Sequence, residues 1–283
     1  MTSHQTGRLA GRACLVTGST GIAAAAATRF AAEGAAVCVA SRTEAHARDL
    51  AARVERSGSR AAWIGADLAD EAQAEAAVAT CVGAFGRIDG LFSVAGGSGR
   101  RFGDGPIHAL TAEAWDRTLE LNLRSQAMVC RAAVRQMLGQ PPNRGGTRGA
   151  ILLMSSVLAT HPVPDLFETH AYAAAKGAIV SLATAMAASY ARAGIRVNAI
   201  APALTDTPMA ARAAGDPATV AFARRKQPLV GGLIDADDVA LAAVYLLSDE
   251  SRAVTGQLLS VDGGWSVTAA PVDEPESVGG DEA

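Results

Sequence analysis

The strongest constraint on how this chain folds is a regular alternation of short apolar runs with longer amphipathic stretches. The apolar runs span residues 13–16, 36–40, 61–65, 90–94, 150–154, 195–200 and 257–261, and helical periodicity spans residues 22–33, 44–56, 70–85, 112–138, 171–193 and 235–247. Strands that alternate with helices form right-handed βαβ units in a parallel sheet that is covered on both faces. The pattern therefore predicts an α/β fold with a doubly wound, seven-stranded parallel sheet.

Composition favours one domain and excludes several classes of partner. No linker-like shift precedes residue 270, so we expect one domain over residues 1–270 and an acidic, disordered tail over residues 271–283. The tail holds five of the 28 acidic residues, which leaves 25 cations against 23 anions and no basic field for nucleic acid. The four cysteines lack metal-binding spacing, the N-terminus lacks an apolar signal region and no uninterrupted apolar run reaches 18 residues. We therefore expect a cytoplasmic protein with no metal site and no membrane contact.

A ligand site is expected where the predicted strands end. The first strand runs into Thr17-Gly18-Ser19-Thr20-Gly21-Ile22-Ala23 and then a helix. Glycines allow the backbone to approach a pyrophosphate, and the helix N-terminus supplies free N–H groups, although such a turn also occurs without a ligand. Three long segments, residues 96–110, 157–169 and 203–232, follow later strands. Because ligands of open α/β sheets bind beyond the carboxyl ends of the strands, we expect these segments to surround one pocket.

A tyrosine and a lysine lie four residues apart in a predicted helix. This spacing places Tyr172 and Lys176 on one helix face, within reach of each other. The chain has only three tyrosines and two lysines, so chance predicts about 0.02 such pairs, although an ordinary surface pair remains the alternative.

The ordered set of motifs resembles the short-chain dehydrogenase/reductase family from about residue 8 to residue 267. The motifs are the Gly-rich turn, Asp67-Leu68, Ala95-Gly96, Asn122, Ser155-Ser156, Tyr172 with Lys176, Arg196 to Pro202 through Thr207, and Thr255-Gly256-Gln257 to Asp262-Gly263-Gly264. The resemblance implies a Rossmann-like domain that uses NAD(H) or NADP(H) on a small alcohol or carbonyl substrate. It also implies a homo-oligomer, a tetramer or a dimer.

The resemblance assigns roles residue by residue. It implies that Tyr172 exchanges a proton with the substrate, that Ser156 hydrogen-bonds the carbonyl, and that Asn122 holds a water connecting Lys176 to solvent. The ammonium of Lys176 and the oxidised nicotinamide are expected to lower the phenol pKa from about 10 toward 7. The implied cofactor-binding residues are Gly18, Ser19, Gly21, Ile22, Ser41, Arg42, Asp67, Leu68, Ala95, Gly96, Tyr172, Lys176, Pro202 and Thr207.

The chain departs from the family pattern at several positions. The Gly-rich turn is one residue short, and Ala23 replaces its last glycine. Ser93-Val94 replaces two asparagines whose amides brace the sheet in the family, and Ala203 replaces a glycine after Pro202. Four further side chains lie in the expected pocket loops: Arg100, Arg101, His161 and His170. For the two arginines we favour solvated charges over contact with an anionic substrate group. Trp63, Trp115 and Trp265 are expected in the core or at an interface.

Cofactor choice depends on the end of the second predicted strand. An NAD-specific site needs a carboxylate there, and this chain has Ser41 followed by Arg42. A hydroxyl and a guanidinium suit a 2′-phosphate, so we expect NADP(H) to be preferred with NAD(H) possible, unless Arg42 only lies flat on the adenine. The predicted function is a ketone reductase or secondary alcohol dehydrogenase. Two alternatives stay open: a non-catalytic cofactor-binding sensor or scaffold, and a lyase or isomerase that uses the same tyrosine.

Overall fold

The computed structural model describes residues 7–143, 145–164 and 166–268, so the predicted acidic tail lies outside the described residues. Its centre is one parallel sheet. The strands are β1 (Ala13–Thr17), β2 (Ala36–Ser41), β3 (Ala61–Gly65), β4 (Gly90–Ser93), β5 (Gly149–Met154), β6 (Ile195–Pro202) and β7 (Leu258–Val261). Their order in the sheet is β3-β2-β1-β4-β5-β6-β7, and every adjacent pair is parallel. The predicted fold class is confirmed.

The strand order creates the place where a ligand can bind. The chain moves outward from β1 to β3 and then returns to add β4 on the other side of β1. Connections therefore leave β1 and β4 in opposite directions, and a crevice opens between their carboxyl ends.

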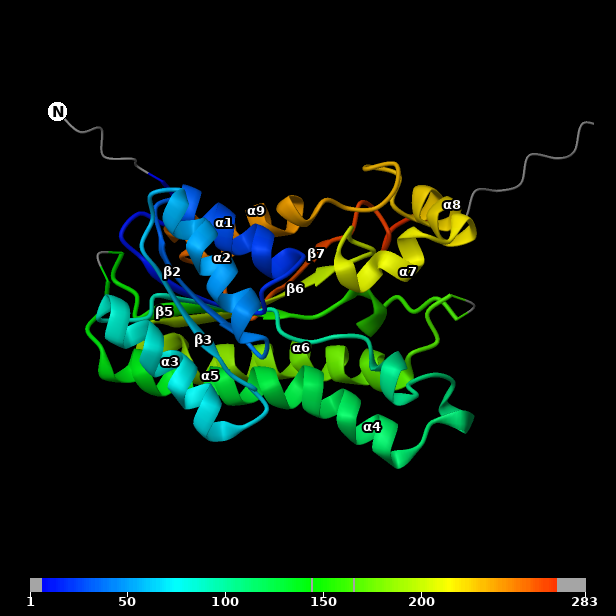
Figure 1. Ribbon diagram of the computed structural model, residues 1–283, viewed down its shortest axis with the longest axis horizontal. Helices are drawn as coiled ribbons and strands as arrows, with labels where there is room; N and C mark the ends of the chain where they lie inside the picture. Colours follow the sequence, from blue (N-terminus) through cyan, green and yellow to red (C-terminus); the bar gives the residue numbers. More distant parts are fainter. Residues whose placement is uncertain (1–6, 144, 165, 269–283) are drawn as a thin grey trace, which may run out of the picture.

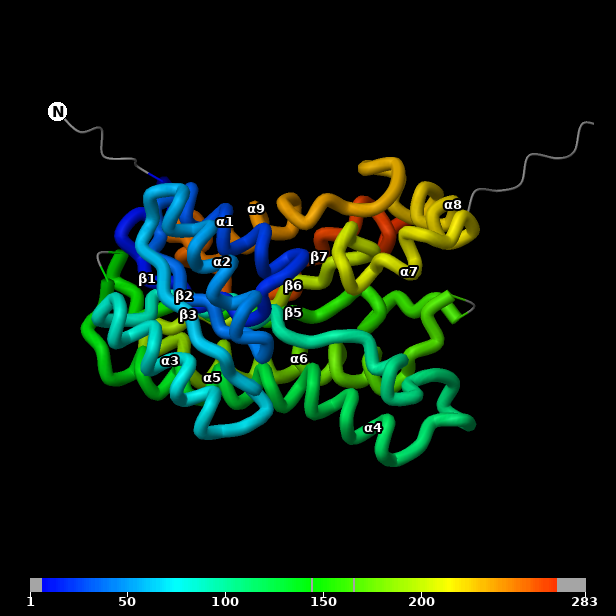
Figure 2. Tube along the Cα trace, viewed as in Figure 1, coloured from blue at the N-terminus to red at the C-terminus, as the bar shows by residue number. Residues whose placement is uncertain are grey.

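Helices cover both faces of the sheet. They are α1 (Ile22–Ala32), α2 (Glu44–Arg56), α3 (Glu71–Phe85), α4 (Ala112–Leu119), α5 (Ser125–Gly139), α6 (His170–Tyr190), α7 (Ala211–Ala214), α8 (Pro217–Lys226) and α9 (Ala236–Leu247). Figure 1 shows α1, α2 and α9 on one face and α3, α5 and α6 on the other, and the trace in Figure 2 follows the same layers. Each layer buries its own apolar cluster against the sheet, one around Phe30 and Phe92 and the other around Leu91 and Ile151.

Two predicted segments are more broken than their periodicity suggests. The helix expected over residues 112–138 consists of α4, a π-helical turn (Glu120–Arg124) and α5. The segment 203–232, expected as a loop, contains α7 and α8. Helix α8 carries a start signal that periodicity alone does not detect: Asp216 accepts hydrogen bonds from the N–H groups of Ala218 and Thr219, and Pro217 follows it.

Helix α6 combines unusual length with an apolar composition. Together with its last turn it spans His170–Ala193. Within the described part of the chain it is the one helix that is long and apolar enough to cross a membrane. The sequence predicted no membrane span here because Lys176 and Arg192 interrupt this apolar segment. A core helix passes the same test, and Ile179 and Ala183 of α6 are buried against the sheet.

Candidate active site

A cleft lies at the carboxyl ends of the central strands. Its walls come from the turn after β1, the segments after β4, β5 and β6, the start of α6, and Trp265. All three long segments expected to surround one pocket contribute to it. The lining residues are 96–98 and 100 from the first segment, 157, 158, 167 and 169 from the second, and 203–205, 207–210, 212 and 213 from the third. Eleven of the predicted site residues line this cleft: Gly18, Ser19, Gly21, Ile22, Ala95, Gly96, Ser156, Tyr172, Lys176, Pro202 and Thr207.

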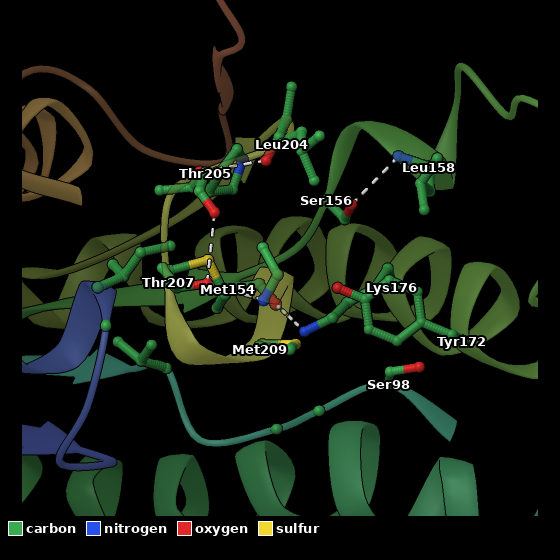
Figure 3. A pocket seen from close by; sticks show the side chains of 18 of the residues that line it. Ser98, Met154, Ser156, Leu158, Tyr172, Lys176, Leu204, Thr205, Thr207 and Met209 are labelled. Atoms are coloured by element: carbon green, nitrogen blue, oxygen red, sulfur yellow. Dashed lines mark hydrogen bonds between the residues drawn. The ribbon is translucent and has the colours of Figure 1, made fainter. Parts of the chain in front are cut away.

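Tyr172 and Lys176 lie on the first two turns of α6 and point to the same side. Figure 3 shows both side chains directed toward the end of β5, where Lys176 Nζ donates a hydrogen bond of 2.9 Å to the Met154 carbonyl. Nζ lies 5.3 Å from the centroid of the Tyr172 ring. Ser156 follows β5 and faces the cleft, and its Oγ accepts a hydrogen bond from the Leu158 N–H. The spacing of four thus brings the pair together as predicted.

Burial sets the protonation behaviour of this pair. It raises the pKa of the Tyr172 phenol to about 12, although the Ser156 hydroxyl lowers it in part. Burial also lowers the pKa of the Lys176 amine to about 7. The expected lowering of the phenol pKa by the lysine is therefore absent in this structure. The reason is desolvation, which disfavours both the phenolate and the ammonium.

A carboxylate that the sequence did not point to holds the start of α6. Asp104 is 5% exposed, and its two oxygens accept hydrogen bonds of 3.0 and 2.9 Å from the N–H groups of Ala171 and Tyr172. The helix's own N-cap residue, Thr169, makes no such side-chain bond. Asp104 thus caps α6 from a distant loop and fixes the backbone of the tyrosine itself. Only its place in Gly103-Asp104-Gly105 could have drawn attention to it.

Asn122 lies directly behind the cleft wall. The π-helical turn presents it, and it is fully buried. Its amide donates hydrogen bonds to the Gly97 and Thr118 carbonyls, and its Oδ1 accepts one from the Gly97 N–H. A Cβ at Gly96 would lie 2.7 Å from Asn122 Oδ1, which explains why glycine is required at this position. In this arrangement Asn122 braces the segment after β4.

The turn after β1 fits a dinucleotide although it is one residue short. Gly18 and Gly21 adopt positive φ angles of 94° and 52°, and α1 begins at Ile22 with no side chain capping its first turn. A Cβ at Gly21 would lie 2.9 Å from Thr207, so the segment after β6 approaches the turn closely. Bare glycine backbone at a helix N-terminus, open to a cleft, matches the requirements of a pyrophosphate.

Another residue replaces the lost asparagine braces. Thr17 Oγ1 accepts hydrogen bonds of 2.9 Å from the N–H groups of both Val94 and Ala95. The hydroxyl of Ser93 is buried and has no partner among the described residues. The sheet is thus tied between β1 and the end of β4 by a threonine of the turn motif, while the neighbouring Ser93 hydroxyl takes no part in this tie.

Four predicted cofactor residues lie outside the cleft lining. The hydroxyl of Ser41 is 3.0 Å from that of Ser19, which links the end of β2 to the turn after β1. Arg42 is exposed. Asp67 is exposed, with its carboxylate accepting a hydrogen bond from the Ala69 N–H, and Leu68 is buried in the core.

The outer end of the cleft is aromatic. Trp265 is 1% exposed and lines the cleft, and its ring lies 6.1 Å from Phe167 and 5.3 Å from Phe222. Trp265 is therefore both a core and a pocket residue, whereas Trp63 is 36% exposed.

The four side chains whose roles the sequence left open, Arg100, Arg101, His161 and His170, have different surroundings in the structure. Arg100 lines the cleft, whereas Arg101 lies 4.5 Å over the Phe102 ring. The two histidines bond elsewhere: Nδ1 of His161 pairs with the Thr160 hydroxyl, and Nδ1 of His170 with the Gly105 carbonyl, both at 2.9 Å.

Comparisons with known proteins agree with this geometry. A family model described as enoyl-(acyl carrier protein) reductase matches residues 16–266. The chain is 35% identical over 256 residues to cis-4-hydroxycyclohexanecarboxylate dehydrogenase of Sinomonas cyclohexanicum, covering 90% of this chain and 96% of that protein.

Solved structures of a dehydrogenase and a reductase also superpose on this chain. A gluconate 5-dehydrogenase from Burkholderia cenocepacia, in complex with NADP and tartrate, superposes with a TM-score of 0.84 at 32% identity and covers 94% of this chain and 99% of that one. A 3-ketoacyl-(acyl-carrier-protein) reductase from Brucella melitensis, complexed with NADH, has a TM-score of 0.79 at 30% identity and covers 92% and 100%.

Proposed function

Because this chain belongs to the short-chain dehydrogenase/reductase family of oxidoreductases, we propose that it interconverts a ketone and a secondary alcohol with Tyr172 as the proton-transferring residue. One observation carries the proposal. Ser156, Tyr172 and Lys176 converge on a cleft whose floor is a glycine cradle at a helix N-terminus. Three polar groups around one point, beside a site for a dinucleotide, are what carbonyl reduction requires.

Each residue has a defined task in this proposal. When bound, the nicotinamide supplies or accepts the hydride. The Ser156 hydroxyl donates a hydrogen bond to the substrate oxygen and holds the carbonyl in place. Tyr172 gives that oxygen its proton, and the pKa of about 12 keeps the phenol protonated at neutral pH, in the form that can donate. Lys176 has a pKa near 7, so its amine can gain or lose a proton at neutral pH. It can therefore add or remove a positive charge beside the phenol at little energetic cost.

NADP(H) is the preferred cofactor in this proposal. The end of β2 carries Ser41, its hydroxyl paired with that of Ser19, and the exposed Arg42 follows it. No carboxylate stands at this strand end, where one would repel a 2′-phosphate and bind a 2′-hydroxyl. The two solved relatives described above were obtained with NADP and with NADH, so relatives alone do not decide the preference.

We propose a cyclic or bulky apolar carbonyl compound as the substrate. The outer cleft is lined by Phe167, Trp265 and Met209, which offer an apolar surface to a ring. The relative from Sinomonas cyclohexanicum is named for a hydroxycyclohexanecarboxylate, a ring alcohol that also carries a carboxylate.

Absorbance of the reduced nicotinamide tests the proposal. We expect NADPH oxidation to depend on an added ketone from a panel of cyclohexanones, steroids, sugars and acyl thioesters. Cofactor binding without turnover on any member would favour a sensor or scaffold. Conversion of a substrate with no net change in cofactor would favour a lyase or isomerase.

A further inference from the structure

Two arginines reach the same cleft from opposite sides. Arg100 lies in a short 3-10 helix (Gly99–Phe102) after β4, and Arg212 lies on α7 after β6. Both line the cleft together with Tyr172. Figures 1 and 2 show the segment before α4 and helix α7 at the same end of the molecule, on opposite sides of the sheet plane.

Arg100 and Arg212 are both exposed where they line the cleft, and their like charges act on each other. Burial lowers the pKa of Arg100, and the charge of Arg212 lowers it further, while Asp104 and Glu168 act in the opposite direction. Arg100 is held in place by a hydrogen bond of 3.0 Å from Nη2 to the Leu166 carbonyl.

Two of the nearby carboxylates are engaged in capping, and the third, Glu168, is exposed and forms no ion pair within 4.0 Å among the described residues. Asp104 caps α6, and Asp216 caps α8 through Thr219 and Ala218. Within residues 7–143, 145–164 and 166–268, neither Arg100 nor Arg212 forms an ion pair within 4.0 Å. The outer cleft therefore has two exposed cations along its lining, beside an apolar wall.

We propose that the substrate carries a carboxylate away from its reacting carbonyl, and that Arg100 and Arg212 bind this carboxylate from the two sides of the cleft. Planar guanidinium groups match a carboxylate with two parallel hydrogen bonds, and an anion between them removes their mutual repulsion. The aromatic end of the cleft accommodates the apolar body between the carbonyl and the carboxylate. This inference rests on the proposed function and narrows its substrate class to keto acids and hydroxy acids.

Matched substrates separate the carboxylate from the rest of the molecule. The probes are 4-oxocyclohexanecarboxylate and its methyl ester, which share the ring and the ketone. Two measurements are made with each probe: kcat/KM with NADPH, and the thermal shift of the protein–NADPH complex. The variants are Arg100→Gln, Arg212→Gln and both together. Arg101→Gln is the control, because that side chain lies over Phe102 outside the cleft.

We expect the wild-type protein to prefer the acid and to be stabilised more by it than by the ester. Each single variant should reduce the acid-to-ester ratio of kcat/KM by about 10- to 100-fold, the effect of losing a hydrogen bond to a charged group. The Arg101→Gln control should keep the ratio. Equal thermal shifts and equal turnover of acid and ester would overturn the inference while leaving the proposed reductase intact.

Two further outcomes also test whether Arg100 and Arg212 bind the carboxylate of the substrate. A loss of NADPH affinity that matches the loss of acid preference would assign the arginines to the cofactor and overturn the inference. Thermal shifts that favour the acid, without turnover of either probe or of any member of the ketone panel, would support the arginine site and contradict the proposed function.

Discussion

Lys176 is only 2% exposed, yet its amine makes a single hydrogen bond within the described structure, to a backbone carbonyl. Its pKa of about 7 lies far below the 10.5 of an exposed lysine. Between these two pH values the unfolded chain binds a proton that the folded chain has released, so stability rises with pH across this window. Below about pH 7 both states are protonated and the full cost of the buried charge remains.

A lysine substitution tests this linkage directly. In Lys176→Met, we expect the free energy of unfolding to lose the rise between about pH 7 and pH 10.5 that Lys176 contributes. The variant should therefore be more stable than the cofactor-free wild type, and the difference should be largest at pH 7 and below. Denaturant unfolding at several pH values measures it. Lys226→Met is the control, since the Lys226 amine reaches the Thr268 carbonyl instead. If the difference in unfolding free energy between wild type and Lys176→Met does not change with pH, the lowered pKa assigned to Lys176 is wrong.

Cofactor preference is also decided by single residues. Ser41→Asp places a carboxylate beside the Ser19 hydroxyl, where it would repel a 2′-phosphate and accept a hydrogen bond from a 2′-hydroxyl. We expect tighter NADPH than NADH binding in the wild type, and a levelled or reversed preference in this variant, measured by fluorescence titration.

Arg42 gives a second test of the same preference. Arg42→Gln should weaken NADPH alone, and Arg48→Gln, on the exposed face of α2, should change neither affinity. Equal affinities of both cofactors for the wild type would overturn the assignment.

The residue types of the cleft were predictable because their order along the chain is distinctive. The pKa values of their titratable groups were not predictable from the sequence. The sequence suggested that the Lys176 ammonium and the oxidised nicotinamide together lower the phenol pKa. In the protein alone, burial raises it to about 12, because the depth of a side chain depends on the packing of distant segments. Arg100 is exposed, as expected, but that it lines the same cleft as Arg212 became visible only in three dimensions.

At the scale of elements, α6 positions the tyrosine and a distant carboxylate positions α6. Asp104→Ala removes both acceptors for the first N–H groups of this helix. We expect a loss of about 1 kcal/mol in stability, as for a lost helix cap, and a fall in kcat that exceeds any rise in KM, because the backbone of Tyr172 loses its anchor.

Two variants distinguish positioning from general damage. Asp104→Asn keeps one acceptor oxygen and should partly restore kcat, while Asp116→Ala, on the exposed face of α4, should match the wild type. A variant that loses stability but keeps the wild-type kcat would show that Asp104 is only structural. Thermal melts and steady-state kinetics on one preparation provide both readouts.

Helix periodicity predicted the long elements and missed the short ones. Strand positions and the helices α1, α2, α3, α6 and α9 follow from the apolar pattern to within a few residues. The helices α7 and α8 were expected as loop because four and ten residues carry little periodic signal, and α8 is announced by its cap at Asp216 instead. The π-helical turn that presents Asn122 interrupts a pattern that reads as continuous helix, since a single turn of five residues is too short to give a periodic signal of its own.

At the scale of the whole molecule, we predict a symmetric homotetramer. The prediction rests on the family resemblance and on long helices rich in small residues, which allow close self-packing. Two apolar side chains are also strongly exposed: Leu229 at 85% and Val267 at 86%. Light scattering at micromolar concentration should give about four times the chain mass of 28.7 kDa. A mass equal to one chain would contradict any self-association.

The central claim is that Tyr172 transfers the proton in a carbonyl reduction, and Tyr172→Phe tests it most directly. The variant keeps the ring that packs against the cleft and removes only the hydroxyl. Tyr190→Phe, at the end of the same helix and far from the cleft lining, is the matched control. On any ketone that the wild type reduces with NADPH, we expect Tyr172→Phe to keep its cofactor affinity and to lose about 10²- to 10⁴-fold in kcat. A Tyr172→Phe protein that retains more than half of the wild-type kcat would contradict the account.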